Sequence, residues 1–391
     1  MSSAAPTVSE IHDGARRAPG ARGPVPPFTA AHEALRGEIR SFVTERLRPH
    51  ADEWEAAGWF PNEVFGWLAQ AGYLGLKFPR VYGGGDDTVA AAVLVEELAR
   101  CGSGGVAAGL GAHAGIALPP ILAFGTEEQK ERYLTPGLRG ELIAALAITE
   151  PDAGSDVASL RTRAREVDGG WLVNGSKTYI TGGVRADVLV CAVATKPESG
   201  HQGISFLLID RGEGVHSSAL RKLGWHASDT AEIGLHDVFV PEENLLGALH
   251  GGFYLIMANF QWERLLMALG AVGAMQACSE LTLDAVRAGG RHGQATRHAL
   301  AHVATEIEAG RAVTYAALRR HLAGQDAVRE VTIAKLRTQR AAVDAIDSCL
   351  QVLGLDAPPE LERALRDARL GPIGGGTDEI MKEILGRSLG L

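Results

Sequence analysis

Two short segments carry side chains whose types and spacing suit a flat, polar ligand. Residues 148–156 place hydroxyls, carboxylates and a glycine around Pro151, which predicts a turn rich in hydrogen-bonding groups. Residues 177–181 run β-branched and aromatic side chains into two glycines, which predicts a strand ending at a tight bend. Turn signals at residues 168–170 and at Asn174-Gly175 lie between these two segments and predict that the region folds into a compact sheet. Threonine hydroxyls at strand ends suit a conjugated ring better than a metal ion; an ordinary threonine-rich sheet is the alternative.

The sequences of these segments resemble those of the acyl-CoA dehydrogenase family, whose middle domain carries a TEPxAGSD turn and a Kx(W/Y)IT strand. The likeness covers roughly residues 30 to 389, because further motifs follow in the family's order. These motifs are residues 127–134, 222–225, 228–230, 238–247, 366–369 and 375–380. The resemblance implies an α+β fold of the acyl-CoA dehydrogenase type, with an N-terminal helical domain, a central β-domain and a C-terminal four-helix bundle.

Hydrophobic spacing predicts the same order of elements. Residues 28–147 have a helical pattern, with a buried helical stretch over 103–122 that breaks near Pro119-Pro120. Strands dominate residues 148–250, and 188–193 and 204–209 are the most β-rich runs. Helices return over 251–391, and the expected spans are 252–289, 296–323, 326–355, 358–370 and 377–389. Residues 1–27 are rich in Ala, Gly, Pro and Ser, which predicts a disordered tail.

The resemblance implies FAD as cofactor and the α,β-dehydrogenation of an acyl thioester, with acyl-CoA as the usual substrate and the 2-enoyl thioester as product. A carboxylate takes the α-proton and the flavin N5 accepts the β-hydrogen as hydride. The cofactor-binding positions implied by the resemblance are Leu146, Ile148, Thr149, Gly154, Ser155, Tyr179, Ile180, Thr181, Arg291, Gln351, Gly354, Thr377 and Glu379. The implied substrate-binding positions are Ser155, Gln261, Arg264, Gly375 and Gly376.

Glu263 is the predicted proton acceptor. Many family members carry a glutamate directly before the Gly-Thr that opens the last helix, and that position is Gly375 here. The isovaleryl and long-chain subgroup carries its base in an ERLxxA context on an earlier helix, which residues 263–268 match. On a helix Glu263 shares a face with Phe260 and Leu266, so partial desolvation is expected to raise its pKa toward neutrality. A glutamate at the helix edge that pairs with Arg264 or with a neighbouring chain is the alternative.

Three other residues also have two interpretations. Arg264 either sets the thioester end of the site or forms a structural ion pair. Tyr179 replaces a family tryptophan that flanks the flavin ring, and its alternative is a core aromatic. Thr377 is an expected helix N-cap whose free backbone N–H groups face the FAD pyrophosphate, and its alternative is a plain acidic helix start.

The positions that hold the adenosine side of FAD in the family depart from its pattern. The family arginine of RxxFG falls at Gly289, and its downstream glutamine falls at about Leu300. The QxxGGxG turn reads Gln351 to Asp356 and has Leu355 in place of its second glycine. Arg287 or Arg291 is a candidate substitute, because an arginine displaced by two residues still reaches a phosphate.

Composition excludes several classes of protein. The 391-residue chain is 46% hydrophobic and 22% charged, as in globular proteins, and its net charge of −9 argues against nucleic acid and anionic membranes. Four dispersed cysteines indicate neither a zinc site nor a disulfide framework, so we expect no metal and a cytoplasmic protein. We expect no membrane span, because no apolar run approaches about 18 residues.

The expected partners follow from the resemblance: an electron-transferring flavoprotein or similar acceptor, and further copies of the chain in a homotetramer or homodimer. Three alternatives remain for function. The first is the same chemistry on an acyl-carrier protein, for which Arg319-Arg320 is a small candidate patch. The second is a flavin monooxygenase on the same fold, and the third is a scaffold that has lost flavin.

Overall fold

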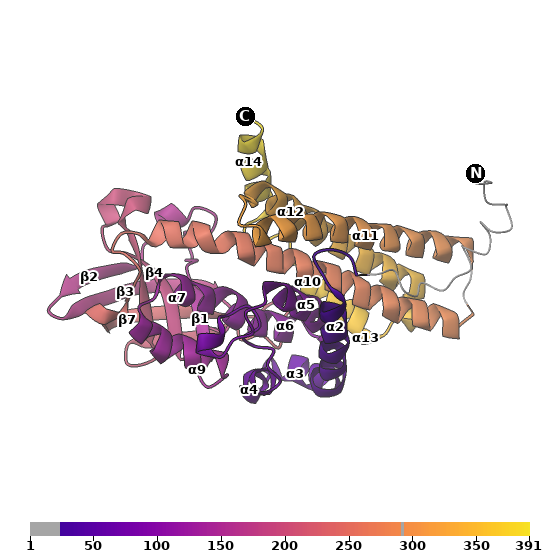
Figure 1. Ribbon diagram of the computed structural model, residues 1–391, viewed down its shortest axis with the longest axis horizontal. Coiled ribbons are helices and arrows are strands. Elements are labelled where there is room, and N and C mark those ends of the chain that lie inside the picture. The colour runs from indigo at the N-terminus through magenta and orange to yellow at the C-terminus, as the bar shows by residue number, and fades with distance from the viewer. Residues whose placement is uncertain (1–23, 291–292) are drawn as a thin grey trace, which may run out of the picture.

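The chain forms three consecutive parts, which are a cluster of helices, a β-sheet and a long helical bundle (Figure 1). The computed structural model describes residues 24–290 and 293–391. The expected arrangement of N-terminal helical, middle β and C-terminal helical parts is confirmed. The predicted tail over 1–27 lies almost wholly outside the described residues.

The N-terminal part consists of short helices around a common apolar core. Its α-helices are α2 (Ala30–Phe42), α3 (Ala51–Ala57), α4 (Glu63–Gln70), α5 (Thr88–Leu98), α6 (Gly104–Gly111), α7 (Leu118–Phe124), α8 (Glu127–Gln129) and α9 (Thr135–Leu138). Three π-helical segments join them, η1 (Val43–Leu47), η5 (Ala112–Ala117) and η6 (Lys130–Leu134). Thr126 caps α8 and its N3 residue Gln129 bonds back to the Thr126 backbone, as expected from the acidic first turn that follows it.

The helix predicted to break near Pro119-Pro120 does not break there. Helical structure runs without interruption from Gly104 to Phe124, and the wide turns of η5 precede Leu118. The prolines lie in the first turn of α7, directly after the wide turns of η5.

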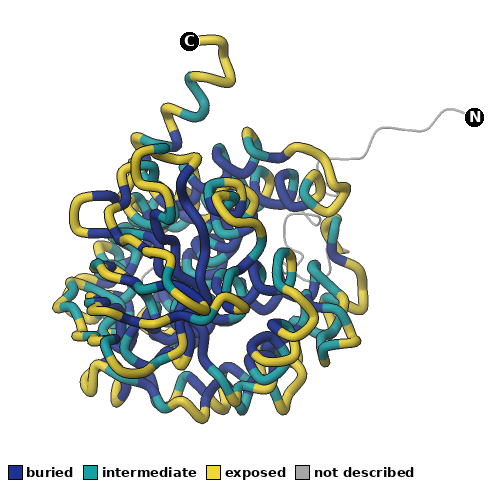
Figure 2. The backbone as a smooth tube through the Cα atoms, turned by 90° about the vertical axis from the view of Figure 1, so that its left-hand side faces the viewer, coloured by how far each residue is buried: buried dark blue, intermediate teal, exposed yellow. Residues whose placement is uncertain are grey.

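The middle part is an eight-stranded sheet in the order β6-β7-β3-β2-β4-β5-β8, with β1 paired to β4. Its strands are β1 (Ala144–Ala147), β2 (Arg163–Val167), β3 (Gly170–Ile180), β4 (Val188–Ala194), β5 (Ile204–Asp210), β6 (Val215–Ala219), β7 (Ala231–Pro241) and β8 (Leu245–Leu246). All of β4 is buried. Side chains alternate along it, so Val190 packs toward the N-terminal helices and Leu189 toward β3 and β7. Figure 2 shows this end of the molecule, with buried backbone at its centre.

Two sequence expectations about the sheet are wrong. Asn174-Gly175 is not a turn but lies inside β3, where the register with β7 shifts between Val173 and Gly175. A glycine within a strand can mark a bulge as well as a turn, and Gly175 has a φ of 155°. The helical pattern does not extend to Ala147, because residues 144–147 form β1 and pair with β4 in parallel.

The C-terminal part contains three long helices that run alternately away from and toward the sheet, α10 (Gly252–Ala288), α11 (Gln294–Leu322) and α12 (Val328–Leu353). The shorter α13 (Pro359–Ala368) packs against α12. The last helix, α14 (Asp378–Ser388), stands out from the body in both views (Figures 1 and 2). All five helices begin and end within two residues of their predicted bounds.

The chemistry of the core agrees with the cysteine pattern and corrects one expectation. Cys101, Cys191, Cys278 and Cys349 are all free and buried. Two helical stretches, Gly104–Phe124 and Gly252–Ala288, are long and apolar enough to cross a membrane, so the expectation that no run approaches that length is wrong. Both pack against other helices in the protein, and a core helix passes the same test of length and composition.

Candidate functional site

The two polar segments that opened the sequence analysis lie side by side. The backbone N–H of Thr178 donates to the carbonyl of Thr149 at 2.9 Å. The fully buried Lys177 reaches across from β3 and donates to the Ile148 carbonyl at 3.0 Å and to Glu150 Oε1 at 2.7 Å. These bonds hold the turn of residues 148–156 against the end of β3.

Sequence reasoning missed this ion pair between Lys177 and Glu150. Burial by itself raises the pKa of Glu150, but the charge of Lys177 and hydrogen bonds from Thr162 and Arg161 keep that pKa below its ordinary value. The backbone N–H of Thr162 donates to Glu150 Oε1 at 3.0 Å. The sequence did contain a signal for this pair. Lys177 stands at an apolar position of the strand and Glu150 at an apolar position of the turn, and the motif brings the strand and the turn together.

Tyr179 is an exposed aromatic ring on a strained backbone. Its φ is 59°, in the left-handed region that side chains other than glycine rarely adopt, and 71% of the residue is exposed. A register shift between β3 and β7 falls at the same place, between Lys177 and Ile180. The core-aromatic interpretation is therefore wrong. The bend turns the ring out of the sheet beside the half-buried Thr181.

We call the residues predicted to contact the flavin ring the ring-side residues. Those that remain divide into an exposed, a half-buried and a buried set. Gly154 and Ser155 are exposed on the turn, and Leu146 and Thr149 are half-buried. Ile148 and Ile180 are buried. An exposed tyrosine and accessible hydroxyls next to one another fit the flat face and polar edge of a flavin ring.

Glu263 lies on α10 with its carboxylate in apolar surroundings. The residue is half-buried, and burial raises the pKa of Glu263 from 4.5 to about 7, although the nearby charges of Arg264 and Lys335 act in the opposite direction. Within residues 24–290 and 293–391, its carboxylate has neither a hydrogen bond nor an ion pair. The alternative of a surface glutamate paired with Arg264 is therefore wrong.

Gly375, the other possible position for a base, lies next to the Glu263 carboxylate. A Cβ built on Gly375 would lie 3.7 Å from Glu263 Oε1 and 2.3 Å from Met267 Sδ. Gly375 and Gly376 have φ values of 61° and 89°, which only glycine adopts without strain. Met267 thus occupies the space that a side chain at position 375 would need, and Glu263 would be in contact with that side chain.

Lys335 on α12 supports this glycine turn from beneath. Its side chain is fully buried and donates to the Gly376 carbonyl at 2.5 Å. Burial lowers the pKa of Lys335 to about 8, and the charges of Asp378 and Glu263 partly oppose that change. Sequence reasoning missed Lys335, but its place on a helix face with the buried Val331 and Thr338 is a recognisable signal.

Arg264 is buried beside the same turn. Its Nε has no hydrogen-bond partner and its guanidinium lies 5.2 Å from the centre of the Phe260 ring. Its Nη2 would lie 3.9 Å from a Cβ built on Gly376. Among the described residues Arg264 forms no ion pair, so the structural-ion-pair interpretation is wrong. The half-buried Gln261 precedes it on α10.

Thr377 is the N-cap of α14, as predicted. Its hydroxyl accepts a hydrogen bond from the Ile380 backbone N–H at 3.3 Å. Asp378 is buried and pairs with Arg340 of α12, whereas Glu379 is exposed. The charge of the acidic side chain nearest the cap is thus offset by Arg340.

The predicted adenosine-side residues lie at the opposite end of the bundle from the sheet. Gly289 follows the end of α10, and the exposed Gly354 follows the end of α12, and both helices run away from the sheet (Figure 1). Gln351 is exposed and donates to Asp347 at 2.6 Å. Leu355 is fully exposed. Arg291 lies outside the described residues, so its predicted role stays a prediction.

The predicted residues for the flavin ring and those for the adenosine therefore lie on two separate surfaces of one chain, the first at the sheet and the second at the far ends of α10 and α12 (Figure 1). In the described part of the chain, no group of three His, Cys, Asp or Glu side chains is placed to hold a metal ion.

Comparison with known proteins assigns all three parts to one family. Residues 29–141, 145–238 and 250–390 match the N-terminal, middle and C-terminal domains of acyl-CoA dehydrogenase. The chain is 35% identical over 377 residues to mitochondrial isovaleryl-CoA dehydrogenase of Solanum tuberosum, covering 93% of this chain and 91% of that one. It is also 35% identical over 379 residues to mitochondrial long-chain specific acyl-CoA dehydrogenase of Mus musculus, covering 93% and 87%. The crystal structure of acyl-CoA dehydrogenase from Geobacillus kaustophilus superposes with a TM-score of 0.89 at 36% identity, covering 94% and 100%.

Proposed function

This chain belongs to the acyl-CoA dehydrogenase family and carries out FAD-dependent acyl-CoA dehydrogenation, and we propose that Glu263 is the base that takes the α-proton of the acyl thioester. One observation carries this proposal. The unpaired carboxylate of Glu263 lies 3.7 Å from the Cβ position of Gly375, where many relatives place their glutamate. Helix α10 and the glycine turn before α14 thus bring the two possible base positions to one point, and only Glu263 has a carboxylate.

The surroundings of Glu263 suit a base that works near neutral pH. With a pKa of about 7, Glu263 is ionised in a large fraction of molecules at pH 7 and still binds a proton strongly enough to remove one from carbon. Lys335 and Arg264 keep positive charge nearby and prevent burial from raising that pKa further. When bound, FAD accepts the β-hydrogen as hydride.

We assign the ring-side surface to the flavin. Tyr179 supplies an exposed aromatic face, and Thr149, Ser155 and Thr181 supply hydroxyls at its edge. Gly375 and Gly376 leave the backbone accessible at the thioester end, and Arg264 lies behind them as a fixed cation.

Reduction of the bound flavin by substrate tests this function directly. Purified protein is mixed under nitrogen with a panel of acyl-CoA thioesters, and loss of flavin absorbance is followed. We expect reduction by at least one straight-chain or branched acyl-CoA in the wild type and none in Glu263→Gln that still binds FAD. Equal reduction in both proteins would place the base elsewhere.

The panel also separates the alternatives. An acyl-carrier-protein thioester that reduces the flavin when no CoA thioester does would favour the carrier-protein reading. Arg320 pairs with Glu330 at 3.2 Å, which reduces the positive charge that the small basic patch of Arg319 and Arg320 offers to an acidic carrier protein. Oxygen consumption without thioester oxidation would indicate a monooxygenase, and a colourless protein would indicate a scaffold.

We further propose a homotetramer or homodimer that passes its electrons to an electron-transferring flavoprotein or a similar acceptor. Helix α14 projects from the body of the molecule, and Leu389 and Leu391 at the end of the chain are exposed. A projecting helix buries little apolar surface by itself, so contact with a second copy of the chain is supported. The separation of the two FAD surfaces supports it as well, because the adenosine-side residues would serve the cofactor of another subunit. Four buried free cysteines support a reducing cytoplasm.

A further inference from the structure

β3 carries one extra residue opposite the start of β7, and Tyr179 lies there. Lys177 pairs with Ile233 of β7. The next pair joins Ile180 to Ala231, so three steps along β3, from 177 to 180, face two steps along β7, from 233 to 231. Such a β-bulge bends a strand and redirects a side chain. It leaves Tyr179 71% exposed with a φ of 59°, a conformation that persists only where neighbouring contacts impose it.

The polar turn before β2 holds one side of this bulge through two neighbouring residues of β3. In the described structure Thr178 is not paired with a residue of β7, and its backbone N–H donates to the Thr149 carbonyl at 2.9 Å instead. The Lys177 amine donates to the Ile148 carbonyl at 3.0 Å and to Glu150 Oε1 at 2.7 Å. The two residues that precede Tyr179 are thus both bound to the turn.

The ion pair within this connection is enclosed by protein. Of Lys177 0% is exposed, and of Glu150 5%. The Glu150 carboxylate is itself fixed, because the backbone N–H groups of Arg161 and Thr162 donate to its two oxygens at 2.5 and 3.0 Å. Loss of the Lys177 amine would leave a buried carbonyl and a buried charge without their donor. The amine therefore determines where the turn lies relative to β3.

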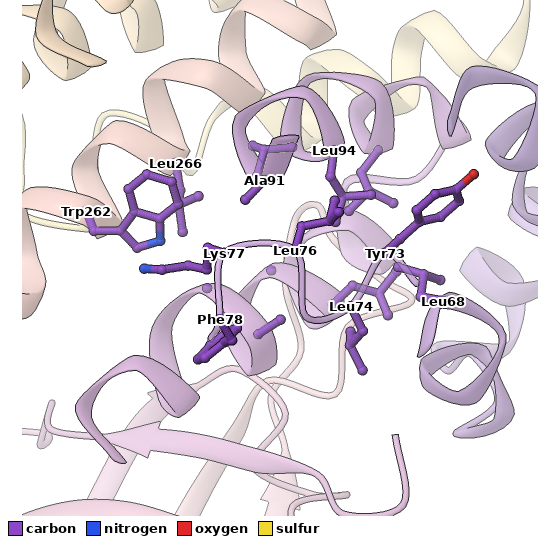
Figure 3. Close-up of a pocket in the computed structure, with 16 residues that line it drawn as sticks. Leu68, Tyr73, Leu74, Leu76, Lys77, Phe78, Ala91, Leu94, Trp262 and Leu266 are labelled. Carbon is purple, nitrogen blue, oxygen red and sulfur yellow. The ribbon is translucent and has the colours of Figure 1, made fainter. Parts of the chain in front are cut away.

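Lys77 provides a chemical comparison. It is half-buried, and its amine lies 4.2 Å from the centre of the Trp262 ring, toward which it points in Figure 3. This contact joins two side chains, whereas the amine of Lys177 binds the backbone of the turn. Lys335 also donates to a backbone carbonyl, but to that of Gly376. Of these three lysines, Lys177 is the one that connects the ring-side residues of the turn with those of β3.

We propose that Lys177 is a positioning residue for the flavin, because it ties the polar turn to β3 and thereby keeps the Tyr179 ring in its exposed conformation at the bulge. This inference rests on the proposed function, which assigns that ring to the flavin. Without the amine, the backbone at Tyr179 relaxes toward a negative φ, and FAD must restore the strained bend when it binds. The apparent affinity for FAD then falls in proportion to the fraction of molecules that still hold the bend.

Release of FAD from the purified, flavin-loaded full chain tests the proposal without any turnover. The protein is diluted in steps, and the fluorescence of released FAD gives its dissociation constant. Lys177→Met should weaken FAD binding about 10- to 100-fold, because backbone strain of this kind corresponds to such a factor in an equilibrium constant. An unchanged dissociation constant in a folded Lys177→Met variant would overturn the proposal.

Two matched variants control for the loss of a positive charge. Arg161 pairs with Asp152 of the same turn at 2.9 Å, but their side chains are 75% and 65% exposed. Arg161→Met should therefore change FAD binding by less than about twofold. Lys77→Met removes a lysine that contacts Trp262 rather than the turn, and it should leave FAD binding unchanged. Losses in these variants as large as that in Lys177→Met would show that the effect is not specific to the turn.

A double-mutant cycle with Tyr179 separates positioning from general support of the fold. Asparagine tolerates a left-handed φ without help, so in a Tyr179→Asn background Lys177→Met should weaken FAD binding only about threefold. Tyr179→Phe keeps both the ring and the strain, so in that background the full loss of about 10- to 100-fold should return. The same factor in the wild type and in the Tyr179→Asn background would overturn the proposal, because Lys177 would then act independently of Tyr179.

A paired variant covers the case in which Lys177→Met does not fold. Adding Glu150→Gln removes the buried charge that has lost its partner, so the double variant should fold. It still lacks the donor to the Ile148 carbonyl, so FAD binding should remain weaker than in the wild type. Hydrogen exchange of the Thr178 amide should also be faster in it, since that N–H bonds to the same turn. Wild-type FAD affinity in this double variant would overturn the proposal.

The outcomes distinguish this inference from the proposed function. If the wild type binds FAD and acyl-CoA reduces it, but Lys177→Met releases FAD no faster, only the inference fails. If the purified wild type holds no FAD, the proposed function and the inference both fail.

Discussion

Replacing Glu263 by Gln should make the protein more stable while it abolishes turnover. Because the pKa of Glu263 in the folded protein is about 7 rather than 4.5, ionising it costs the folded state free energy. That cost is absent below about pH 4.5 and complete above about pH 7. The interval corresponds to up to about 3 kcal/mol of unfolding free energy, which the glutamine variant regains at pH 8.

Thermal unfolding at two pH values measures this difference. With about 2 cal/mol/K of unfolding entropy per residue, a 391-residue chain gains about 4 °C in Tm from 3 kcal/mol. We therefore expect Glu263→Gln to melt about 4 °C above the wild type at pH 8 and at nearly the same temperature at pH 5. Flavin reduction by substrate should fall by at least about 100-fold.

Glu45→Gln is the matched control, because Glu45 is an exposed glutamate on a helical segment. It should change neither Tm nor activity at either pH. A Glu263→Gln variant with the same Tm as the wild type at pH 8 would show that the carboxylate is not desolvated. The physical argument for Glu263 as a base near neutrality would then be refuted, whatever the activity of the variant.

Three further predictions concern the same site. The rate of flavin reduction should rise about tenfold per pH unit below about pH 7 and level off above it. Lys335→Met should move the midpoint of this pH profile upward, because the charge of Lys335 lowers the pKa of Glu263. An unmoved midpoint in stopped-flow pH profiles would contradict this electrostatic interaction. Gly375→Glu in the Glu263→Gln background should recover almost no activity unless Met267→Ala is added, because Met267 Sδ lies 2.3 Å from the new Cβ; full recovery without it would show that the turn moves freely. Tyr179→Asn should stabilise the flavin-free protein by about 1 kcal/mol, because asparagine tolerates the left-handed φ of 59°. The same variant should weaken FAD binding in titrations. Stronger FAD binding would show that Tyr179 does not belong to the flavin site.

Local sequence patterns predicted the elements of this protein well where one face had to be buried. The helices of the C-terminal bundle begin and end close to their expected residues, because an apolar stripe at helical spacing has few other solutions. The patterns failed where a residue type suits two structures. Asn174-Gly175 suits both a turn and a strand bulge, and residues 144–147 suit both a helix and a buried strand.

The polar partners of the site were harder to predict because they come from distant parts of the chain. Lys335 reaches the glycine turn from α12, 41 residues before Gly376 in sequence. Met267 fills the space beside Gly375 from α10. Lys335 lies outside the motifs and Met267 fills a variable position of one, and each acts through contacts that exist only after the helices have packed.

The sequence by itself determined the order of helices and strands, the resemblance to the acyl-CoA dehydrogenases and the choice of Glu263 over the missing glutamate at position 375. These are properties of residue type and spacing along one chain. Only the tertiary structure decided that the carboxylate of Glu263 is unpaired and desolvated and that Tyr179 is exposed on a strained bend. Burial and the lack of a partner depend on every neighbour in space, and a pKa follows from both, so no local pattern encodes them.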